Sequence, residues 1–492
     1  MEQFRIMVRF LVILALSLIL SGCGGGGTTG PAEGHGDSAS NRGPFQLSVR
    51  VDTGRVRGQT IGPLSTIVRV KVELLGLNGN DYLSPREVMV EQSAVSATFS
   101  PVEVGSYTIR VSGFNTNQTL VAGPLSQSVQ VSAGQATSAS FTLSVPPVEK
   151  DFLFASTFDD SIYVFQSNPT TGVLTQTPNA PFALPTGAGA NELVSGPGGR
   201  FLYCDYANLD QVARFSVDPA TGDVSALDTV ATGDNPAGMD TDPQKEFLFV
   251  PNRNDRTISV YRISQTDGTL SQVPGSPFVV AGATTPQRVY TDPQGRFLFI
   301  TDFALVGELF VMRIDRTTGA LTQTVGPFQA FPVAFRTFAV TTNPAGTILY
   351  VAGNFNDLAV FDINQTTGFL TARPNVPAIS INVGELIFDA TRQVLYAVGF
   401  SDDLVRTFQL DAADNIGAEI AASPVLTGGI NPLTAILTPD KTRLYVANFQ
   451  TTGQVSAFLP GQDGSLTPVA GQPYPCGSGP FGIEFLRLQS FP

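Results

Sequence analysis

Residues 291–302, with the sequence TDPQGRFLFITD, decide the fold of this chain. The first part, DPQGR, has the composition of a turn, because proline presets φ and glycine tolerates positive φ. The second part, FLFI, is a short apolar run of the length that is typical of a buried strand. This stretch therefore predicts a tight turn that leads into a core strand.

The same strand recurs seven times along the chain. It reads FLFA at 152, FLYC at 201, FLFV at 247, FLFI at 297, ILYV at 348, VLYA at 394 and RLYV at 443. These starts lie 46 to 51 residues apart, and periods of about 40–50 residues are typical of propellers and solenoids. A second strand, a hairpin and an outer strand follow each one, and an inner strand precedes six of them. The repeats predict seven units of four strands.

The two ends of the repeat region complement each other. The first unit starts at Asp151 without an inner strand, and the chain ends with an inner-strand phrase, PFGIEFL, at 480–486. Pairing of this tail with the first unit would close the ring and remove the exposed sheet edges. We therefore predict an all-β protein whose residues 150–492 form a seven-bladed β-propeller closed by the C-terminal strand. The expected neighbours at the closure are Ile483 and Phe485 beside Leu153 and Ala155.

The N-terminus has the features of an export signal. Arg5 and Arg9 precede an apolar run over 10–20 that is too short to span a bilayer. The sequence LSGC at 20–23 resembles a bacterial lipobox, which implies that residues 1–22 are a signal peptide and that Cys23 is acylated. Attached acyl chains would hold the protein on the periplasmic or extracellular face of a bacterial envelope. An ordinary secretion signal followed by a chance cysteine is the alternative.

Two segments separate this anchor from the repeats. Residues 23–44 are rich in Gly and Ser, as in a flexible tether; they include His35, the only histidine, for which we expect no role. Residues 45–145 contain about six strand-like runs, and YTIRV at 107–111 alternates apolar and polar residues. This pattern predicts an immunoglobulin-like or prealbumin-like β-sandwich, which we interpret as a spacer.

Composition excludes several classes of function. The net charge is −13 and the isoelectric point is about 4.6, whereas nucleic-acid binding requires a basic surface. We find no cysteine or histidine spacing typical of a metal site, no nucleotide-binding loop and no tryptophan. We therefore predict neither a metal nor a cofactor. The spacing of Cys204 and Cys476 leaves open whether the two form a disulfide.

Several repeat phrases resemble those of a known family. DPQGRFLFITD, TPDKTRLYVAN and TDGTLSQVPGSPF are similar to the repeats of the lactonase-type seven-bladed propellers, which include bacterial 6-phosphogluconolactonase and fungal carboxymuconate cyclase and have the YVTN surface-protein propellers as neighbours. The resemblance covers residues 150–492. It implies lactone hydrolysis by an inner-strand histidine and a glutamate at the end of the next strand, with arginines that bind an acidic substrate.

The chain departs from this catalytic pattern. Residues 36–492 contain no histidine, and Ala237 and Gln287 stand where the family histidine is expected. The glutamate position is not acidic in any unit, although Arg253 matches a family arginine. General acid–base catalysis needs a titratable group within reach of the substrate, and Asp205 and Asp302 are weak candidates for that role.

The loops at one end of the propeller are rich in aromatic residues. We expect a rim at this mouth, able to bind a small apolar ligand or an envelope protein, with Arg253 and Arg288 as charge partners. The predicted rim residues are Phe158, Tyr206, Phe303, Phe355, Phe400 and Phe449, with Phe331, Phe335 and Tyr474 on segments between blades. The alternative is that these rings pack between blades as ordinary core.

Two functions are compatible with these observations. The preferred hypothesis is a non-catalytic envelope lipoprotein whose propeller binds a ligand or a partner protein. The alternative is a lactone hydrolase, similar to 6-phosphogluconolactonase, in which other residues replace the catalytic pair.

Overall fold

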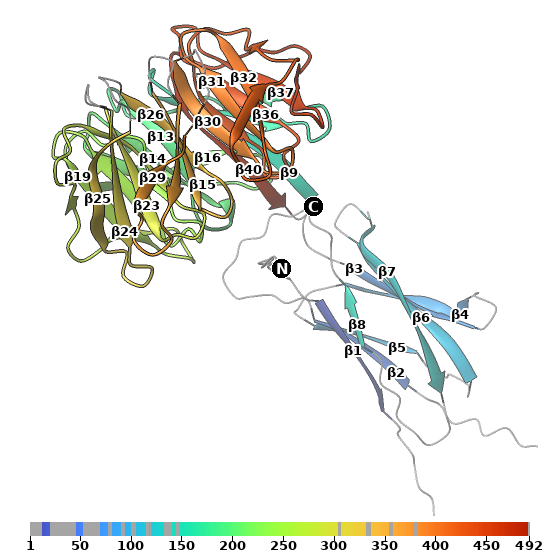
Figure 1. Cartoon of the computed structure of the whole chain (residues 1–492). Coiled ribbons are helices and arrows are strands. Elements are labelled where there is room, and N and C mark those ends of the chain that lie inside the picture. Colours follow the sequence, from blue (N-terminus) through green and yellow to red (C-terminus); the bar gives the residue numbers. More distant parts are fainter. Residues whose placement is uncertain are drawn as a thin grey trace, which may run out of the picture. The chain divides into compact units, whose positions relative to one another are not determined.

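The structure is a computed structural model with two compact units, Met1–Val148 together with Gln489–Pro492, and Glu149–Leu488. Figure 1 shows the strands of both units. The residues that the structure describes are 12–19, 46–52, 69–76, 81–89, 94–99, 105–114, 118, 120–131, 140–143, 148–303, 307–330, 336–353, 358–374, 376 and 382–490.

The first unit contains two four-stranded sheets in its described part. One sheet has the order β5-β2-β1-β8, with strands Ala94–Phe99, Gln46–Asp52, Val12–Ile19 and Ser140–Leu143. The other has the order β4-β3-β6-β7, with strands Asp81–Met89, Arg69–Leu75, Gly105–Phe114 and Leu120–Val131. In β6 the side chains of Tyr107, Ile109 and Val111 are buried, as the alternating pattern predicts. The likeness to an immunoglobulin or prealbumin domain stays a prediction.

Strand β1 comes from the segment that the sequence predicts as a signal peptide. It pairs with β2 on one side and with β8 on the other, so cleavage before Cys23 would remove the strand that joins these two. Cys23, the tether and His35 lie outside the described residues, and lipidation stays a prediction. The described part of the chain has no helix with the length and hydropathy that crossing a bilayer requires.

The second unit is built from seven sheets of four principal strands, counted over its described residues. We number them blade 1 to blade 7. From the inner strand outward, blade 1 is β40-β9-β10-β11 (Pro480–Ser490, Val148–Thr157, Ser161–Ser167, Leu174–Gln176), blade 2 is β13-β14-β15-β16 (Ala190–Ser195, Phe201–Tyr206, Gln211–Val217, Val224–Ala231) and blade 3 is β17-β18-β19-β20 (Asp240–Thr241, Phe247–Asn252, Thr257–Ile263, Leu270–Gln272). Blade 4 is β22-β23-β24-β25 (Pro286–Thr291, Phe297–Asp302, Glu308–Ile314, Leu321–Gln329) and blade 5 is β26-β27-β28-β29 (Thr337–Thr342, Ile348–Gly353, Leu358–Ile363, Leu370–Ala372). Blade 6 is β30-β31-β32-β33 (Val383–Asp389, Val394–Gly399, Leu404–Leu410, Ile416–Glu419) and blade 7 is β35-β36-β37-β38 (Pro432–Leu437, Leu444–Asn448, Gln454–Pro460, Leu466–Pro468). Four short strands pair with third strands: β12, β21, β34 and β39 (Phe182–Ala183, Phe278–Val279, Val425–Leu426, Tyr474–Pro475).

The repeated apolar strand is the second strand of each blade. In β14, β18, β23, β27 and β31 every residue is buried, because both faces of the strand lie against neighbouring blades. Strands that are buried on both faces read as continuous apolar runs rather than as alternating ones. This burial explains why the runs stand out in the sequence.

The C-terminal strand completes the first blade. β40 pairs with β9 in one sheet, and the two strands lie side by side in Figure 1. Ile483 and Phe485 share a hydrophobic cluster with Leu153 and Ala155, and the same cluster includes Tyr445 and Val455 of blade 7. Blade 1 therefore packs against blade 7, and the predicted neighbours at the closure are confirmed.

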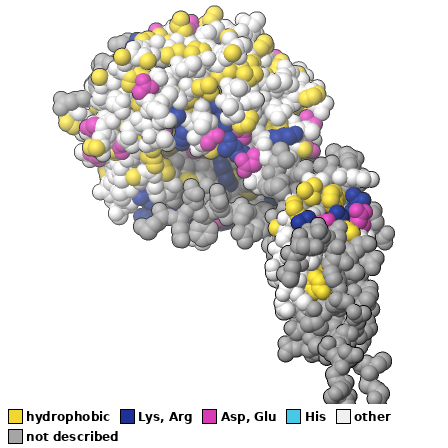
Figure 2. All heavy atoms as spheres, turned by 90° about the vertical axis from the view of Figure 1, so that its right-hand side faces the viewer, with side chains coloured by type: hydrophobic (Ala, Val, Ile, Leu, Met, Phe, Trp, Pro, Cys, Tyr) yellow, Lys and Arg dark blue, Asp and Glu magenta, His cyan; other side chains and the backbone are white. Residues whose placement is uncertain are grey.

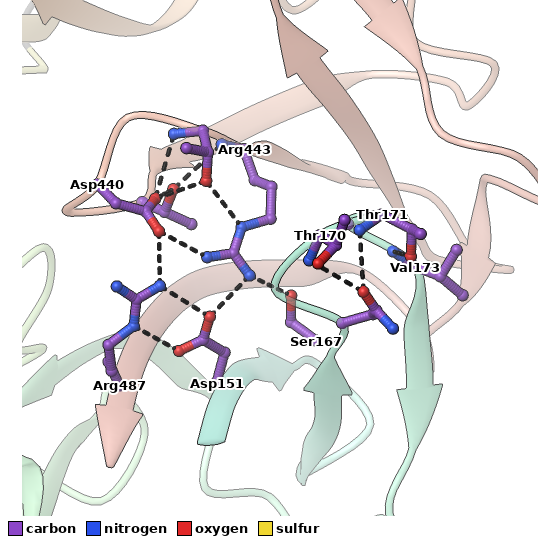
Figure 3. A network of polar contacts seen from close by, with 12 residues as sticks. Asp151, Ser167, Thr170, Thr171, Val173, Asp440, Arg443 and Arg487 are labelled. Carbon is purple, nitrogen blue, oxygen red and sulfur yellow. Dashed lines mark hydrogen bonds and ion pairs between the residues drawn. The ribbon is translucent and has the colours of Figure 1, made fainter. Parts of the chain in front are cut away.

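A partly buried polar network joins the two blades at this seam (Figure 3). The carboxylate of Asp151 in β9 accepts from Arg487 of β40 at 2.8 Å and lies 2.8 Å from the guanidinium of Arg443. Asp440 accepts from the same two arginines, at 2.6 and 3.0 Å. The four side chains join strand β40 to both blade 1 and blade 7.

Candidate functional site

The third residue of the inner-strand segment brings charged side chains of blades 2, 4 and 6 together. We call this the channel position. In blades 1 to 7 it is occupied by Gly482, Glu192, Gly238, Arg288, Ala339, Glu385 and Thr434, and Phe338 lies one residue before it in blade 5. Arg288 of blade 4 reaches both Glu192 of blade 2 and Glu385 of blade 6, and contacts between such distant blades are made across the axis.

Arg288 lies at the centre of this group. Its Nη1 donates to Oε2 of Glu385 at 3.0 Å, and its Nη2 lies 3.6 Å from Oε2 of Glu192. The guanidinium also lies over the rings of Phe338 and Phe481, 5.3 and 5.7 Å from their centroids. Cation–π contacts are strengthened when the cation is desolvated, so the rings and the two carboxyls together fix the arginine across the channel.

Gly238 makes room for this arginine. A Cβ atom at Gly238 would lie 2.4 Å from Cγ of Arg288 and 2.5 Å from the carbonyl oxygen of Gln287, and the residue has φ of +38°. Any larger residue in this channel position would displace the Arg288 side chain.

Burial raises the pKa of the carboxyl groups around Arg288. Burial raises the pKa of Glu192 to about 8; Arg288 opposes this rise, and Asp205, Glu385 and Glu484 add to it. Burial likewise raises the pKa of Asp205 to about 7 and raises that of Glu385. Removing a carboxylate from water disfavours its charged form, and the values for Glu192 and Asp205 allow these two groups to exchange protons near neutral pH.

The carboxylate of Asp205 is hydrogen-bonded to the backbone of Glu192. The Asp205 carboxylate is fully buried and accepts from the backbone N–H of Glu192 at 2.7 Å and from the Asn191 side chain at 3.2 Å. These contacts make Asp205 a positioning group for Glu192.

Two arginines present unpaired N–H groups to this site. Within the described residues, Nε and Nη2 of Arg288 and Nε of Arg253 are buried without a hydrogen-bond acceptor. Arg253 donates from Nη1 to Asn235, and burial lowers its pKa, an effect that nearby Asp205 opposes. Buried donors in native proteins are almost always paired, so these groups indicate a water molecule or the oxygen of a ligand.

Aromatic rings extend outward from Arg288 on two sides. On one side Phe481 contacts Phe449 and Phe158, with ring centroids 6.3 and 5.9 Å away. Phe158 is 44% exposed, so this aromatic wall runs from the buried arginine to the surface. On the other side Phe338 contacts Phe303 at 6.1 Å.

The structure brings together part of the predicted site. Arg288, Arg253, Phe158, Phe303 and Phe449 belong to the cluster just described. Tyr206 does not, because it is 2% exposed and packs between blades 1 and 2; its predicted place on the rim is wrong. Phe400 is half-buried at the end of β31, and Tyr474 packs against the core between blades 7 and 1. Phe331, Phe335 and Phe355 lie outside the described residues.

Asp302, the other weak catalytic candidate, has a structural position. Its carboxylate is fully buried and accepts from the backbone N–H groups of Thr284 and Thr285. It therefore braces the loop that enters β22.

Glu192, Glu385, Phe338 and Phe481 are not among the site residues predicted from the sequence. The predicted histidine column, which contains Ala237 and Gln287, lies one residue before the channel position. Reading the next column of the repeat would have found both glutamates and the arginine between them.

The remaining chemistry of the described residues is limited. No group of three or more His, Cys, Asp or Glu side chains there is placed to hold a metal ion. Cys204 and Cys476 are buried and unpaired, and they lie in two different core clusters. On the face seen in Figure 2, acidic and basic side chains of the propeller lie next to each other rather than in separate patches.

Known proteins share this architecture. The family model described as "Lactonase, 7-bladed beta-propeller" matches residues 149–285. A 6-phosphogluconolactonase from Pectobacterium atrosepticum is 23% identical to this chain. The alignment covers 51% of this chain and 75% of the Pectobacterium protein. A periplasmic gluconolactonase from Pseudomonas aeruginosa superposes with a TM-score of 0.56 at 19% identity, over 70% of this chain and all of its own. The structure of a putative 6-phosphogluconolactonase from Bacteroides uniformis superposes with a TM-score of 0.57 at 19% identity. The match covers 69% of this chain and 99% of the Bacteroides chain. Residues Glu149–Leu488 therefore form a seven-bladed β-propeller, of which residues 149–285 match the lactonase family model.

Proposed function

We propose that the propeller hydrolyses a neutral lactone at the channel site, with Glu192 as general base and Arg288 as the group that binds the carbonyl oxygen. The observation that carries this proposal is a carboxyl with a pKa of about 8 beside an arginine that has unpaired buried N–H groups. A base whose pKa lies near the working pH is the most effective. Relatives named as lactonases support the same type of reaction.

The reaction follows from these groups. Ionised Glu192 takes a proton from water as the water oxygen bonds to the lactone carbonyl carbon. The oxyanion that forms accepts hydrogen bonds from the Arg288 guanidinium, a stabilisation that is strong in a site shielded from water. The ring C–O bond then breaks, and its oxygen takes the proton from Glu192, which leaves a hydroxy acid.

The charges of the site favour an uncharged substrate. Three carboxyls, those of Glu192, Asp205 and Glu385, surround two guanidinium groups, those of Arg253 and Arg288. When they are ionised, these three carboxyls outnumber the two guanidinium groups, and the wall of Phe158, Phe449 and Phe481 suits an apolar face. We therefore infer that neutral lactones with an apolar or aromatic face are preferred over phosphorylated ones.

The proposed location is the bacterial envelope, with Cys23 as the lipid anchor and the β-sandwich as a spacer. Two observations support it: the lipobox-like LSGC at 20–23 and a structural neighbour that is named as a periplasmic enzyme.

A second candidate is binding without turnover, in which the channel site or the aromatic wall holds a small ligand or an envelope protein. The absence of histidine from residues 36–492 favours it, because the family resemblance implies an imidazole in catalysis.

One assay separates the two candidates. The purified full chain is given δ-gluconolactone, dihydrocoumarin or 6-phosphogluconolactone, and acid release above the spontaneous rate is followed by pH-stat. Hydrolysis that Glu192→Gln abolishes supports the lactonase. The matched control is Glu419→Gln, since Glu419 pairs with Arg406 in blade 6 outside the channel. Calorimetric binding without acid release supports the second candidate, and turnover that survives Glu192→Gln contradicts the catalytic assignment.

A further inference from the structure

A second polar site lies away from the channel, between blades 4 and 5. A groove of about 660 Å³ is lined by the turn after β24, by Arg296 and by the turn after β28. Three arginines line it, Arg296, Arg313 and Arg316, with Asp315 as the one acidic side chain. This concentration of positive charge stands out in a chain with a net charge of −13.

Arg296 forms the fixed wall of the groove. Its Nε and Nη2 donate to Asp292 at 2.9 and 2.8 Å, and its Nη1 donates to Gln365 of blade 5 at 2.6 Å. The guanidinium also lies 5.5 Å from the ring centroid of Phe297. These contacts hold Arg296 in place and leave its charge balanced by Asp292.

Arg313 and Arg316 are the available groups. Both are exposed, and neither takes part in a hydrogen bond or ion pair with another described residue. The carboxylate of Asp315, between them, accepts from the backbone N–H groups of Thr317 and Thr318, at 2.9 and 3.0 Å. These backbone hydrogen bonds, foremost that of Thr318, lower the pKa of Asp315. Arg313 also contributes by its charge to this lowered pKa, but neither guanidinium group is tied up in a hydrogen bond.

The turn that carries Arg316 is held in place by its neighbour. Arg262 of blade 3 donates to the carbonyl oxygen of Thr317, and Gly319 donates to the carbonyl oxygen of Asp315. The groove is therefore a preorganised surface, which lowers the cost of binding.

The sevenfold repeat provides an internal comparison. Arg313 lies opposite Phe297 in the register, and the same pairing in other blades identifies the corresponding positions. In each of the other six blades we compare the positions that correspond to Arg296, Arg313 and Arg316. These positions contain only two further arginines, Arg200 and Arg262. Folding of a blade therefore does not require these arginines, and blade 4 is distinctive in having all three.

We propose that this groove binds a phosphate group of a small phosphorylated molecule. Guanidinium groups match phosphate oxygens through paired hydrogen bonds. Two exposed guanidinium groups with the hydroxyls of Thr322 and Thr366 on the lining offer more donors than a carboxylate can use and suit the three terminal oxygens of a phosphate. This site is independent of the channel and of the proposed hydrolysis.

The test is calorimetric titration of the purified full chain with inorganic pyrophosphate at low salt. We expect one site per chain, and we expect Arg313→Gln combined with Arg316→Gln to weaken binding by more than about 10-fold. The matched control combines Arg214→Gln with Arg373→Gln. It removes the same charge from two arginines that already pair with Asp228 and Asp362.

Three results would overturn the proposal. They are no binding of pyrophosphate at concentrations up to about 10 mM, equal weakening in the control variant, and binding only to vesicles that contain phosphatidic acid. The last result would assign the groove to a membrane surface instead of a small molecule. Arg313 and Arg316 are exposed, so their variant is expected to keep the melting temperature of the wild type. The side chains of Arg214 and Arg373 are 11% and 18% exposed, so the melting temperature of the control variant is measured before its binding is compared.

Discussion

Arg443 and Asp151 form an ion pair at the seam of the propeller, with an N–O distance of 2.8 Å and side chains that are 1% and 3% exposed. Arg443 precedes β36 in blade 7, whereas Asp151 lies in β9 of blade 1. Arg487 of the C-terminal strand bonds the same carboxylate. One buried aspartate thus connects the first blade, the last blade and the closing strand.

Replacing this aspartate should destabilise the ring. In Asp151→Asn the buried Arg443 loses its buried counter-charge, and both arginines keep only the partly exposed Asp440; breaking a buried pair typically costs about 3–5 kcal/mol. We expect the free energy of unfolding in urea to fall by about that amount. The control is Asp362→Asn, which breaks the pair of Arg373 with a half-exposed aspartate and should cost less than about 1 kcal/mol. Equal losses in the two variants would show that the seam has no special role.

The proposed base predicts a definite pH profile. Glu192 acts in its ionised form, so kcat/KM should rise with pH and level off above about 8, the value to which burial raises its pKa. Glu385 contributes to that rise, so Glu385→Gln should move the inflection to lower pH. Arg288, Asp205 and Glu484 also face this carboxyl and are unchanged in the variant. A profile that is flat above pH 6 would contradict the assignment, since an ordinary glutamate titrates near 4.3.

Gly238→Ala should displace Arg288. The new Cβ would lie 2.4 Å from Cγ of Arg288, so the guanidinium would move away from Glu385 and Glu192. We expect kcat to fall at least about 100-fold, as happens when a single oxyanion donor is lost. Arg288→Met removes the same donor without backbone strain and should give a similar loss. Full activity in both variants would exclude a catalytic role for this arginine.

Substitution of an aromatic residue at the exposed end of the wall should weaken substrate binding more than it lowers the stability of the protein. Phe158 is 44% exposed, so Phe158→Ser should raise KM for dihydrocoumarin by about 3- to 10-fold, the worth of one aromatic contact, with little change in melting temperature. Phe481 is 8% exposed, and Phe481→Ala should lower stability by about 3–5 kcal/mol. A large drop in melting temperature for Phe158→Ser would support the core alternative.

The lipobox predicts the mass of the mature protein. When the full chain is expressed in a bacterium with lipoprotein processing, we expect a product that begins at Cys23, carries acyl chains and partitions into detergent. Cys23→Ser should abolish the acylation. Intact-mass measurement decides the question, because a product that retains residues 12–19 would keep β1 in its sheet and contradict cleavage.

The sequence by itself determined the propeller. The turn and the apolar strand recur seven times because each blade must bury both faces of its second strand, and such a local requirement is readable in every repeat. The first repeat, at Asp151, has no inner strand before it, and the chain has an extra inner strand at 480–486. Because an open sheet edge is unfavourable, these two features together predicted the closure.

Only the tertiary structure decided which side chains meet. Glu192, Arg288 and Glu385 lie far apart in the sequence, and each occupies the same position of a different blade. Their contact depends on the radius of the ring and on the room that Gly238 leaves. The raised pKa values have the same origin, because burial and opposing charges arise only when the channel is assembled.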